Sequence, residues 1–267
     1  MSREKITTAK LLAMKEPGEK IAALTAYECL FARLLDEVGV EVILVGDSLG
    51  MVFAGYETTL PVTMEQMLYH TRIVADAAEY ALVVGDMPFM SFQVSAEETL
   101  RNAGRFLQEG RAQAVKLEGG AEIADRVRRL ADAGIPVMGH LGLTPQSIHK
   151  LGGYGVRAKT ADEARKLLAD AEALEQAGVF SLVLEKIPGM LAKEVSEKVG
   201  VPTIGIGAGP HCDGQILVTQ DLLGLFERFR PKFVRRYAEL GKMARKACLG
   251  YRTDVKAGTF PAPEESF

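Results

Sequence analysis

The sequence predicts an α/β protein, a (β/α)8 TIM barrel with a short N-terminal helix and C-terminal closing helices. Eight short apolar runs alternate with segments of helical periodicity. Glycine separates several helices from the apolar run that follows, as expected where a helix ends before a buried strand. Polar or ionisable residues follow almost every apolar run. A doubly wound open sheet is the alternative, but it usually has fewer strands and needs a switch point.

The chain begins with a helix, a strand and a second helix. Residues 7–15 have apolar side chains at helical spacing, and the Pro17-Gly18 pair ends this helix. Residues 21–27 form an apolar run of strand length. Residues 28–38 place apolar side chains three and four positions apart, which indicates an amphipathic helix ending at Gly39.

Further helices follow from the same periodicity. Three of them start with the reciprocal capping box, in which Ser or Thr precedes Glu or Gln by three positions: Thr63, Ser95 and Thr160. The predicted helices cover residues 64–79, 96–109, 121–133, 161–177 and 191–199. One or two closing helices are expected over residues 231–249, followed by an irregular tail over 258–267.

The remaining apolar runs have the length and composition of strands buried on both faces. Together with the first run they number eight and cover residues 21–27, 42–45, 81–84, 112–117, 135–139, 180–184, 203–207 and 215–218. Glycine lies between helix and strand at four junctions: Gly39, Gly134, Gly178 and Gly200. We expect each glycine to adopt the left-handed conformation that closes a helix.

Composition fits one globular domain over residues 1–267. The chain has 48% apolar and 25% charged residues, an ordinary balance, and a net charge of −3 that gives no basic surface for nucleic acid. Its three cysteines are an odd number without metal-ligand spacing, which favours a reducing compartment. No apolar run is long enough for a membrane span, and residues 1–18 contain no signal-peptide core. We expect a cytoplasmic protein.

The ends of the predicted strands carry the candidate catalytic residues. In a barrel of this kind the active site lies where the strands exit at their C-terminal ends. Two apolar runs end in Gly-Asp, which delivers Asp47 and Asp86 to the same end of the barrel, and Glu118 follows another run. These are hard oxygen ligands without thiolates or paired histidines, so Mg²⁺ is expected rather than zinc. The competing interpretation is that each aspartate caps a loop or helix.

Three other ionisable residues lie at strand ends. Lys116 suits an anionic substrate or a developing enolate, and Glu185 follows an apolar run that favours a raised pKa and a general-base role. His140 ends a further strand. Structural alternatives remain open: an internal ion pair between Lys116 and Glu118, a core histidine, and a solvated strand end at Glu185. Residues 205–209 are glycine-rich and fit either phosphate binding or close backbone packing.

A serine hydrolase is a distinct hypothesis. Residues 46–50 match the G-x-S-x-G nucleophile elbow, with Ser48 as the nucleophile. An elbow requires a helix directly after the serine, and we expect instead a loop rich in Gly, Thr and Pro. None of the four histidines has an aspartate three residues before it, as the Gly-Asp-Ser-Leu esterases need.

Motifs spread over nearly the whole chain resemble the ketopantoate hydroxymethyltransferase family, and they occur in the family's order. They are VGDSLGMV (45–52), TLPVT (59–63), YHTR (69–72), GDMPFMSFQ (85–93), AVKLEGG (114–120), GHLGLTPQS (139–147), GGYGVRAK (152–159) and IGIGAGPHCDGQILV (204–218). One departure is Asp76, where the resemblance leads us to expect a basic residue.

The resemblance implies transfer of a one-carbon unit from methylenetetrahydrofolate to α-ketoisovalerate (3-methyl-2-oxobutanoate). The product is ketopantoate, on the route to pantothenate and coenzyme A. It implies Mg²⁺ and a homo-oligomer, typically a decamer. Carried over by position, it makes Asp47 and Asp86 metal ligands, with Glu118 reaching the metal through water.

The resemblance also implies roles for the other strand-end residues. Ser48 and Lys116 would bind the keto acid, His140 would lie beside it, and Glu185 would be the base. Two alternatives stay open at this point. A Mg²⁺-dependent lyase or mutase of another α-keto acid needs the same metal logic but no folate. A non-catalytic barrel would not need ionisable residues at its strand ends.

Overall fold

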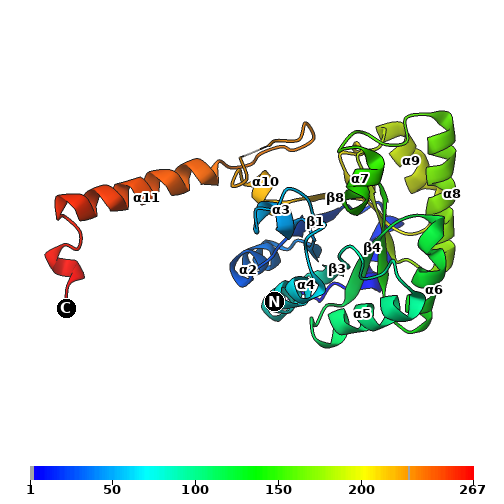
Figure 1. Cartoon of the computed structure of the whole chain (residues 1–267), viewed down its shortest axis with the longest axis horizontal. Helices are drawn as coiled ribbons and strands as arrows, with labels where there is room; N and C mark the ends of the chain where they lie inside the picture. Colours follow the sequence, from blue (N-terminus) through cyan, green and yellow to red (C-terminus); the bar gives the residue numbers. More distant parts are fainter. Residues whose placement is uncertain (1–2, 228) are drawn as a thin grey trace. The chain divides into compact units, whose positions relative to one another are not determined.

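The computed structural model describes residues 3–227 and 229–267. Eight parallel strands form a closed barrel in sequence order from β1 to β8, so the predicted (β/α)8 barrel is confirmed. The β8 strand pairs with β1 and closes the ring (Figure 1). The strands are β1 (Ile21–Thr25), β2 (Val42–Val45), β3 (Leu82–Asp86), β4 (Ala114–Glu118), β5 (Val137–Gly142), β6 (Ser181–Glu185), β7 (Thr203–Ile206) and β8 (Gly214–Leu217).

Helices alternate with the strands and surround the barrel (Figure 1). The long helices before β8 are α1 (Thr8–Lys15), α2 (Cys29–Val38), α4 (Met64–Ala77), α5 (Ala96–Gln108), α6 (Ala124–Asp132), α8 (Ala161–Ala177) and α9 (Gly189–Lys198). Short helical turns lie in the connections: α3 (Leu49–Val52), η1 (Ala121–Ile123), η2 (Pro145–Ser147) and α7 (Ile148–Leu151). The predicted helices are therefore present; α8 has the predicted bounds, and the boundaries of the others differ by at most three residues.

The capping signals form as the sequence predicts, with two exceptions. Thr63 and Thr160 each make the complete reciprocal box, whereas Ser95 contributes its side-chain half, with Oγ accepting a hydrogen bond from the Glu98 backbone N–H. Gly39 and Gly178 close α2 and α8 in the left-handed conformation. Gly200 does not follow this pattern, because α9 ends in an extended residue and the Gly200 N–H donates instead to a Glu175 carboxylate oxygen.

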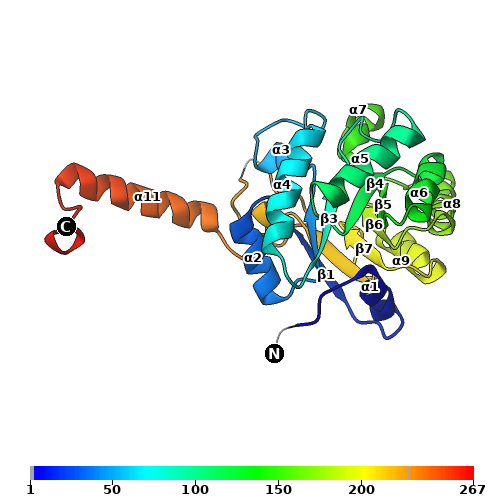
Figure 2. The ribbon, with the colours of Figure 1, turned by 90° about the horizontal axis from the view of Figure 1, so that it is seen from below.

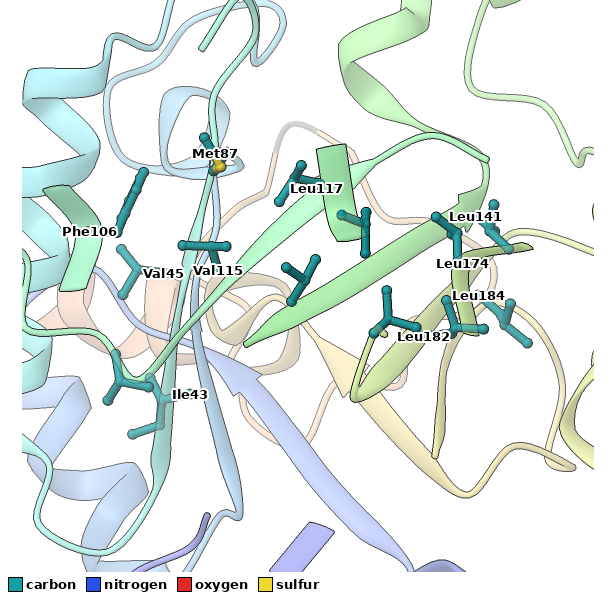
Figure 3. Close-up of a cluster of buried hydrophobic side chains, with 14 of the residues drawn as sticks. Ile43, Val45, Met87, Phe106, Val115, Leu117, Leu141, Leu174, Leu182 and Leu184 are labelled. Atoms are coloured by element: carbon teal, nitrogen blue, oxygen red, sulfur yellow. The ribbon is translucent and has the colours of Figure 1, made fainter. Parts of the chain in front are cut away.

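Alternate residues of each strand face two different apolar layers. One layer lies between the strands and the surrounding helices, where Val115 and Leu117 of β4 pack in the same cluster as Phe106 of α5 (Figure 3). The other layer consists of strand residues that fill the barrel interior, such as Val84 and Ala114, together with side chains of α1. Figure 2 shows α1 beside β1. Side chains along a strand alternate between the two layers with a period of two. Residues two positions apart on one strand therefore point the same way, either into the barrel or toward the helices.

The chain divides into two compact units, residues Met1–Leu217 and Val218–Phe267. The first contains the barrel, and a single domain over the whole length stays a prediction. The second contains α10 (Thr219–Leu222), α11 (Leu240–Ala257) and the turn η3 (Pro263–Glu265). The prediction of one or two closing helices over 231–249 is wrong in its bounds, since α11 starts later and continues through Gly250 to Ala257. Glycine lowers the stability of a helix interior without excluding it.

Candidate active site

The barrel interior carries charged side chains where the strands exit. Asp86 lies two residues beyond Val84, and Lys116 two residues beyond Ala114, so both share the inward-facing side of their strands. The register of the parallel strands sets these residues beside one another: Asp86 pairs with Lys116, and Glu118 pairs with His140. Glu185 pairs with the last residue of β5. The sequence-predicted strand-end residues therefore converge at one end of the barrel.

Lys116 lies at the centre of this group. Its Nζ is 2.8 Å from Asp86 Oδ1, 3.9 Å from Glu118 Oε1 and 3.3 Å from His140 Nδ1. The side chain is only 4% exposed. Burial opposes the charge on the ammonium, but the carboxylates of Asp86, Glu118 and Asp47 outweigh it and raise the pKa of Lys116. Lys116 is therefore a buried, fixed cation among these carboxylates. Lys116 does form an ion pair with Glu118, but its distance to Asp86 is shorter.

His140 connects two carboxylates. Its Nδ1 is 3.4 Å from Glu118 Oε1, and its Nε2 is 3.3 Å from Glu185 Oε2. Burial and the charge of Lys116 oppose protonation, but the interactions with the carboxylates of Glu118 and Glu185 outweigh both and raise the pKa of His140 to about 9. His140 is therefore a buried histidine that takes part in a charged network, with one carboxylate facing each of its ring nitrogens. Glu185 is the more exposed end of that network, with a side chain that is 16% exposed.

Asp47 and Asp86 form a buried pair of acids. The Asp47 backbone N–H donates to Asp86 Oδ2 at 3.1 Å, and the two residues are 4% and 2% exposed. Burial raises the pKa of Asp47 well above its usual range, and the negative charges of Asp86 and Glu118 raise it further. Burial also raises the pKa of Asp86, partly opposed by Lys116. Buried like charges that repel each other are costly unless a cation or proton compensates them.

Gln146 is the site residue that sequence reasoning missed. It is 5% exposed, and its Nε2 donates to Asp47 Oδ2 at 3.0 Å and to the Met87 carbonyl at 2.9 Å. Its backbone N–H donates to Glu118 Oε2 at 3.0 Å. Gln146 therefore holds two carboxylates at once, that of Asp47 after β2 and that of Glu118 at the end of β4. It lies in the turn η2 after β5, and its membership of the GHLGLTPQS motif was the available signal.

Ser48 does not have the surroundings of a hydrolase nucleophile. The prediction that no helix follows it is wrong, because the one-turn helix α3 begins at Leu49. The loop rich in Gly, Thr and Pro comes after this turn. Ser48 Oγ lies 2.8 Å from the hydroxyl of Tyr27, which is a hydrogen-bond partner rather than a general base at neutral pH. The serine and tyrosine hydroxyls together supply neutral donors and acceptors beside the acid pair.

Two other sequence features receive structural explanations. Gly209 supports close packing, since a Cβ there would lie 3.0 Å from the Cα of Gly189, in the segment after β6. Asp76, the departure from the family pattern, forms an exposed ion pair of 2.6 Å with Arg111. Neither feature contributes to the charged network.

Among the described helices, none is both long and apolar enough to cross a membrane.

The donor set fits a magnesium ion at Asp47 and Asp86. No group of three or more His, Cys, Asp or Glu side chains in residues 3–227 and 229–267 has the placement of a metal cage. Mg²⁺ does not require one, since it usually keeps several waters and binds through one or two carboxylates. The acid pair is buried, and the pKa values of both carboxyl groups are raised. A bound cation would relieve the unfavourable burial of these two negative charges. The oxygens of Glu118 already contact His140 and Gln146.

Comparison with solved structures supports the fold. Phosphonopyruvate hydrolase, solved in complex with oxalate and Mg²⁺, superposes with a TM-score of 0.63 at 13% identity, covering 97% of this chain and 93% of that chain. The 2,3-dimethylmalate lyase, a PEP mutase/isocitrate lyase superfamily member, gives a TM-score of 0.60 at 14% identity, covering 99% and 90%. At this identity the likeness concerns the barrel alone.

Comparison of sequences identifies the family. The 3-methyl-2-oxobutanoate hydroxymethyltransferase of Syntrophus aciditrophicus (strain SB) is 57% identical over 263 residues, covering 98% of this chain and 97% of the relative. The protein of the same name from Thermoanaerobacter sp. (strain X514) is 55% identical over 264 residues, covering 99% and 96%. The family profile described as ketopantoate hydroxymethyltransferase matches residues 5–263. The chain belongs to the ketopantoate hydroxymethyltransferase family.

Proposed function

We propose that the protein transfers a hydroxymethyl group from methylenetetrahydrofolate to 3-methyl-2-oxobutanoate, giving ketopantoate and tetrahydrofolate for pantothenate and coenzyme A synthesis. The observation that carries this is the convergence of a buried acid pair, the Lys116 cation and the Glu185 carboxylate at one barrel end. The activity printed in the names of relatives at 55–57% identity agrees with this chemistry.

Asp47 and Asp86 would hold Mg²⁺, with Glu118 in contact through water. When bound there, the ion acts as a Lewis acid on the keto oxygen and carboxylate of the substrate. Gln146 fixes the orientation of Asp47 and of Glu118, which is the role of residues that surround a metal-binding shell. The cofactor and co-substrate of the proposal are therefore Mg²⁺ and methylenetetrahydrofolate.

Glu185 would be the general base. It removes the single hydrogen from C3 of the keto acid: the C3–H bond breaks, a Glu185 O–H bond forms, and the electron pair becomes an enolate. His140 Nε2, 3.3 Å from Glu185 Oε2, orients the carboxylate. Lys116 faces the developing negative charge, where a preorganised cation is most effective. Ser48, together with Lys116, would bind the keto-acid oxygens.

The enolate carbon then forms its new bond to the one-carbon unit. Both bonds between that carbon and the folate nitrogens break, one nitrogen takes up the proton held by Glu185 and the other a proton from water, and tetrahydrofolate leaves. Water supplies the hydroxyl oxygen, so the sum is keto acid, methylenetetrahydrofolate and water giving ketopantoate and tetrahydrofolate. The assay is direct: ketopantoate should appear only when both substrates and Mg²⁺ are present. Conversion of a 2-oxo acid without folate would favour a lyase or mutase instead.

Two variants test the assigned roles. Asp86→Ala should abolish the metal-dependent binding of 3-methyl-2-oxobutanoate in calorimetry, because one of the two proposed ligands is lost. Unchanged binding would contradict the ligand assignment. Glu185→Gln should still bind the keto acid but should stop exchange of its C3 deuterium with solvent. Normal exchange would remove Glu185 as the base.

We also propose that the chain forms one domain over 1–267 and works as a homo-oligomer, a decamer by resemblance, in the cytoplasm. Light scattering coupled to gel filtration should give a multiple of the 28.9 kDa chain mass. A monomeric mass would contradict the assembly. The other partners of the proposal are the two small-molecule substrates.

A further inference from the structure

A glycine-rich segment follows α7 at the catalytic end of the barrel. We define the Tyr154 segment as residues 152–158, with the sequence GGYGVRA. Gly152 and Gly153 have φ values of +69° and +131°, which L side chains rarely adopt, and a Cβ on either residue, or on Gly155, would meet nothing within 4 Å. Glycine is therefore required here by backbone conformation rather than by close packing. The segment presents one aromatic side chain, Tyr154.

Lys186 attaches this segment to the strand that carries Glu185. The Lys186 Nζ donates a hydrogen bond to the Tyr154 carbonyl, and the Arg157 N–H donates to the Lys186 carbonyl at 2.8 Å. The Lys186 N–H donates to the Ile206 carbonyl at 2.9 Å. Lys186 has a φ of +48°, a conformation that costs energy in a residue with a side chain. Its surroundings hold it there, and such strain persists at functional sites when the structure determines it from several sides.

The Tyr154 side chain extends from the β6 side of the barrel to the β2 side. Its hydroxyl lies 3.9 Å from the sulfur of Met51 in α3, four residues after Asp47. Figure 1 shows α3 and α7 at the same end of the barrel. Burial raises the pKa of Tyr154, and the charges of Asp47 and Glu185 raise it further. The phenol therefore lies within the electrostatic reach of two residues on opposite sides of the reacting centre, while 38% of Tyr154 remains exposed to solvent.

We propose that the Tyr154 segment covers the open side of the reacting centre. Tyr154 is the substrate-contacting residue that shields the enolate of the 2-oxo acid from water. Lys186 is the positioning residue that holds Tyr154 in this place. This inference rests on the proposed function. It adds to that function a residue that decides between two fates of the same intermediate.

The two fates differ in which bond the enolate carbon forms. In the productive one, C3 bonds to the one-carbon unit and water supplies the hydroxyl oxygen. In the abortive one, C3 takes a proton back from Glu185 after that carboxyl has exchanged its proton with solvent, and the keto acid is regenerated with a solvent hydrogen. Excluding water from a reacting centre suppresses such proton leakage. An aromatic cover should therefore lower the ratio of exchange to product.

The experiment measures that ratio in full-length protein with Mg²⁺, both substrates and D₂O. Tyr154→Ala should raise the ratio of C3 deuterium incorporated to ketopantoate formed by about tenfold to a hundredfold, the scale on which misplaced groups cost catalysis. Tyr154→Phe should stay close to the parent, because the ring covers the site and the hydroxyl contact to sulfur is long. Val38→Ala, an exposed apolar truncation in α2 outside this segment, is the control and should leave the ratio unchanged.

Lys186 is tested with a second pair. Lys186→Met removes the hydrogen bond to the Tyr154 carbonyl and should raise the ratio in the same direction. Lys186→Arg keeps a donor and should restore the parent value. Both variants keep a side chain at the same left-handed position, so backbone strain is matched. Equal thermal unfolding temperatures across the series exclude loss of folding as the cause.

The outcomes separate this inference from the proposed function. A parent protein that gives neither exchange nor ketopantoate overturns the proposed function itself. If the parent makes ketopantoate and both Tyr154→Ala and Lys186→Met keep the parent's ratio of exchange to product, the proposed covering role of the segment is wrong. Exchange and product falling together in Tyr154→Ala would also overturn it, since Tyr154 would then be needed for proton removal. If Lys186→Arg behaves like Lys186→Met, the positioning role of Lys186 is wrong.

Discussion

Gln146 donates a side-chain hydrogen bond to Asp47 across 3.0 Å, although the two residues are 99 positions apart in the chain. The same Gln146 binds Glu118 through its backbone N–H. One neutral residue thus fixes two of the buried carboxylates whose mutual repulsion the site must contain. The hydrogen bond from Gln146 therefore decides which carboxylate oxygen of Asp47 remains available to a cation.

Replacing Gln146 by Ala should weaken Mg²⁺ binding. The change removes the donor to Asp47 Oδ2 and leaves the Met87 carbonyl without that partner. Loss of such an outer contact typically costs about 10- to 100-fold in metal affinity. Calorimetric titration with Mg²⁺ measures the affinity, and Gln176→Ala, which removes an exposed amide of α8, is the control. Equal affinities for parent and Gln146→Ala would show that Gln146 does not orient the metal site.

Lys116→Met should destabilise the fold strongly. It leaves Asp86 and Glu118 buried without their cation, and breaking a buried ion pair costs about 3–5 kcal/mol. The matched control is Lys193→Met, which removes an exposed pair with Glu197 at 3.6 Å and should cost at most about 1 kcal/mol. Urea unfolding of both variants gives the comparison. A loss at Lys116 no larger than at Lys193 would mean that the carboxylates find other compensation.

Gly85→Ala should destabilise the barrel beside the acid pair. A Cβ at Gly85 would lie 2.4 Å from the Phe106 ring, and overpacking of this kind costs about 1–3 kcal/mol. Gly104 is in α5, the same helix as Phe106, and a Cβ there would meet nothing within 4 Å. Gly104→Ala should therefore stabilise the protein by about 0.5–1 kcal/mol. Thermal unfolding should move in opposite directions, and a shift of the same sign in both would refute the packing argument.

The stability of the second unit should depend on Asp221 in mildly acidic solution. Burial raises the pKa of Asp221 to about 6, partly opposed by Arg236. Because an unfolded aspartate titrates near about 3.9, the folded state binds more protons between these values, and this group's contribution to stability falls as pH rises through the window.

Asp221→Asn removes that fall. The variant's advantage in free energy of unfolding over the parent should therefore be larger at about pH 7 than at about pH 4. Denaturant titrations at both pH values measure the difference. A pH-independent advantage would place the cause elsewhere than in the ionisation of Asp221.

Much of the site was predictable because each strand end is a local feature. Asp47, Asp86, Lys116, Glu118, His140 and Glu185 each follow or end an apolar run, and a barrel collects its strand ends on one rim. The prediction could not say which of them touch. Contacts such as that between His140 and Glu185 depend on the register of the strands. A change of register by one residue turns every side chain of the strand to the opposite face of the sheet.

The connections were less predictable than the strands. The turn carrying Gln146 and the one-turn helix after Ser48 are too short to show a periodicity in the sequence. Helix α11 continues through the exposed Gly250 because a single glycine lowers the stability of a helix without ending it. Gly200 fits the same junction pattern as Gly39, but its backbone N–H is held by Glu175 from a neighbouring helix. Local propensity is a weak prior that such contacts override.

The sequence by itself determined the alternation of buried strands and amphipathic helices, the barrel and the kinds of residue at its rim, because hydrophobic periodicity and helix capping act over a few neighbouring residues. The tertiary structure decided the rest: the pairing of Lys116 with Asp86, the bridge that Gln146 makes between distant carboxylates, and the attachment of Tyr154 to Lys186. These contacts join residues far apart in the chain, and only closure of the barrel brings their strands and loops within hydrogen-bonding distance.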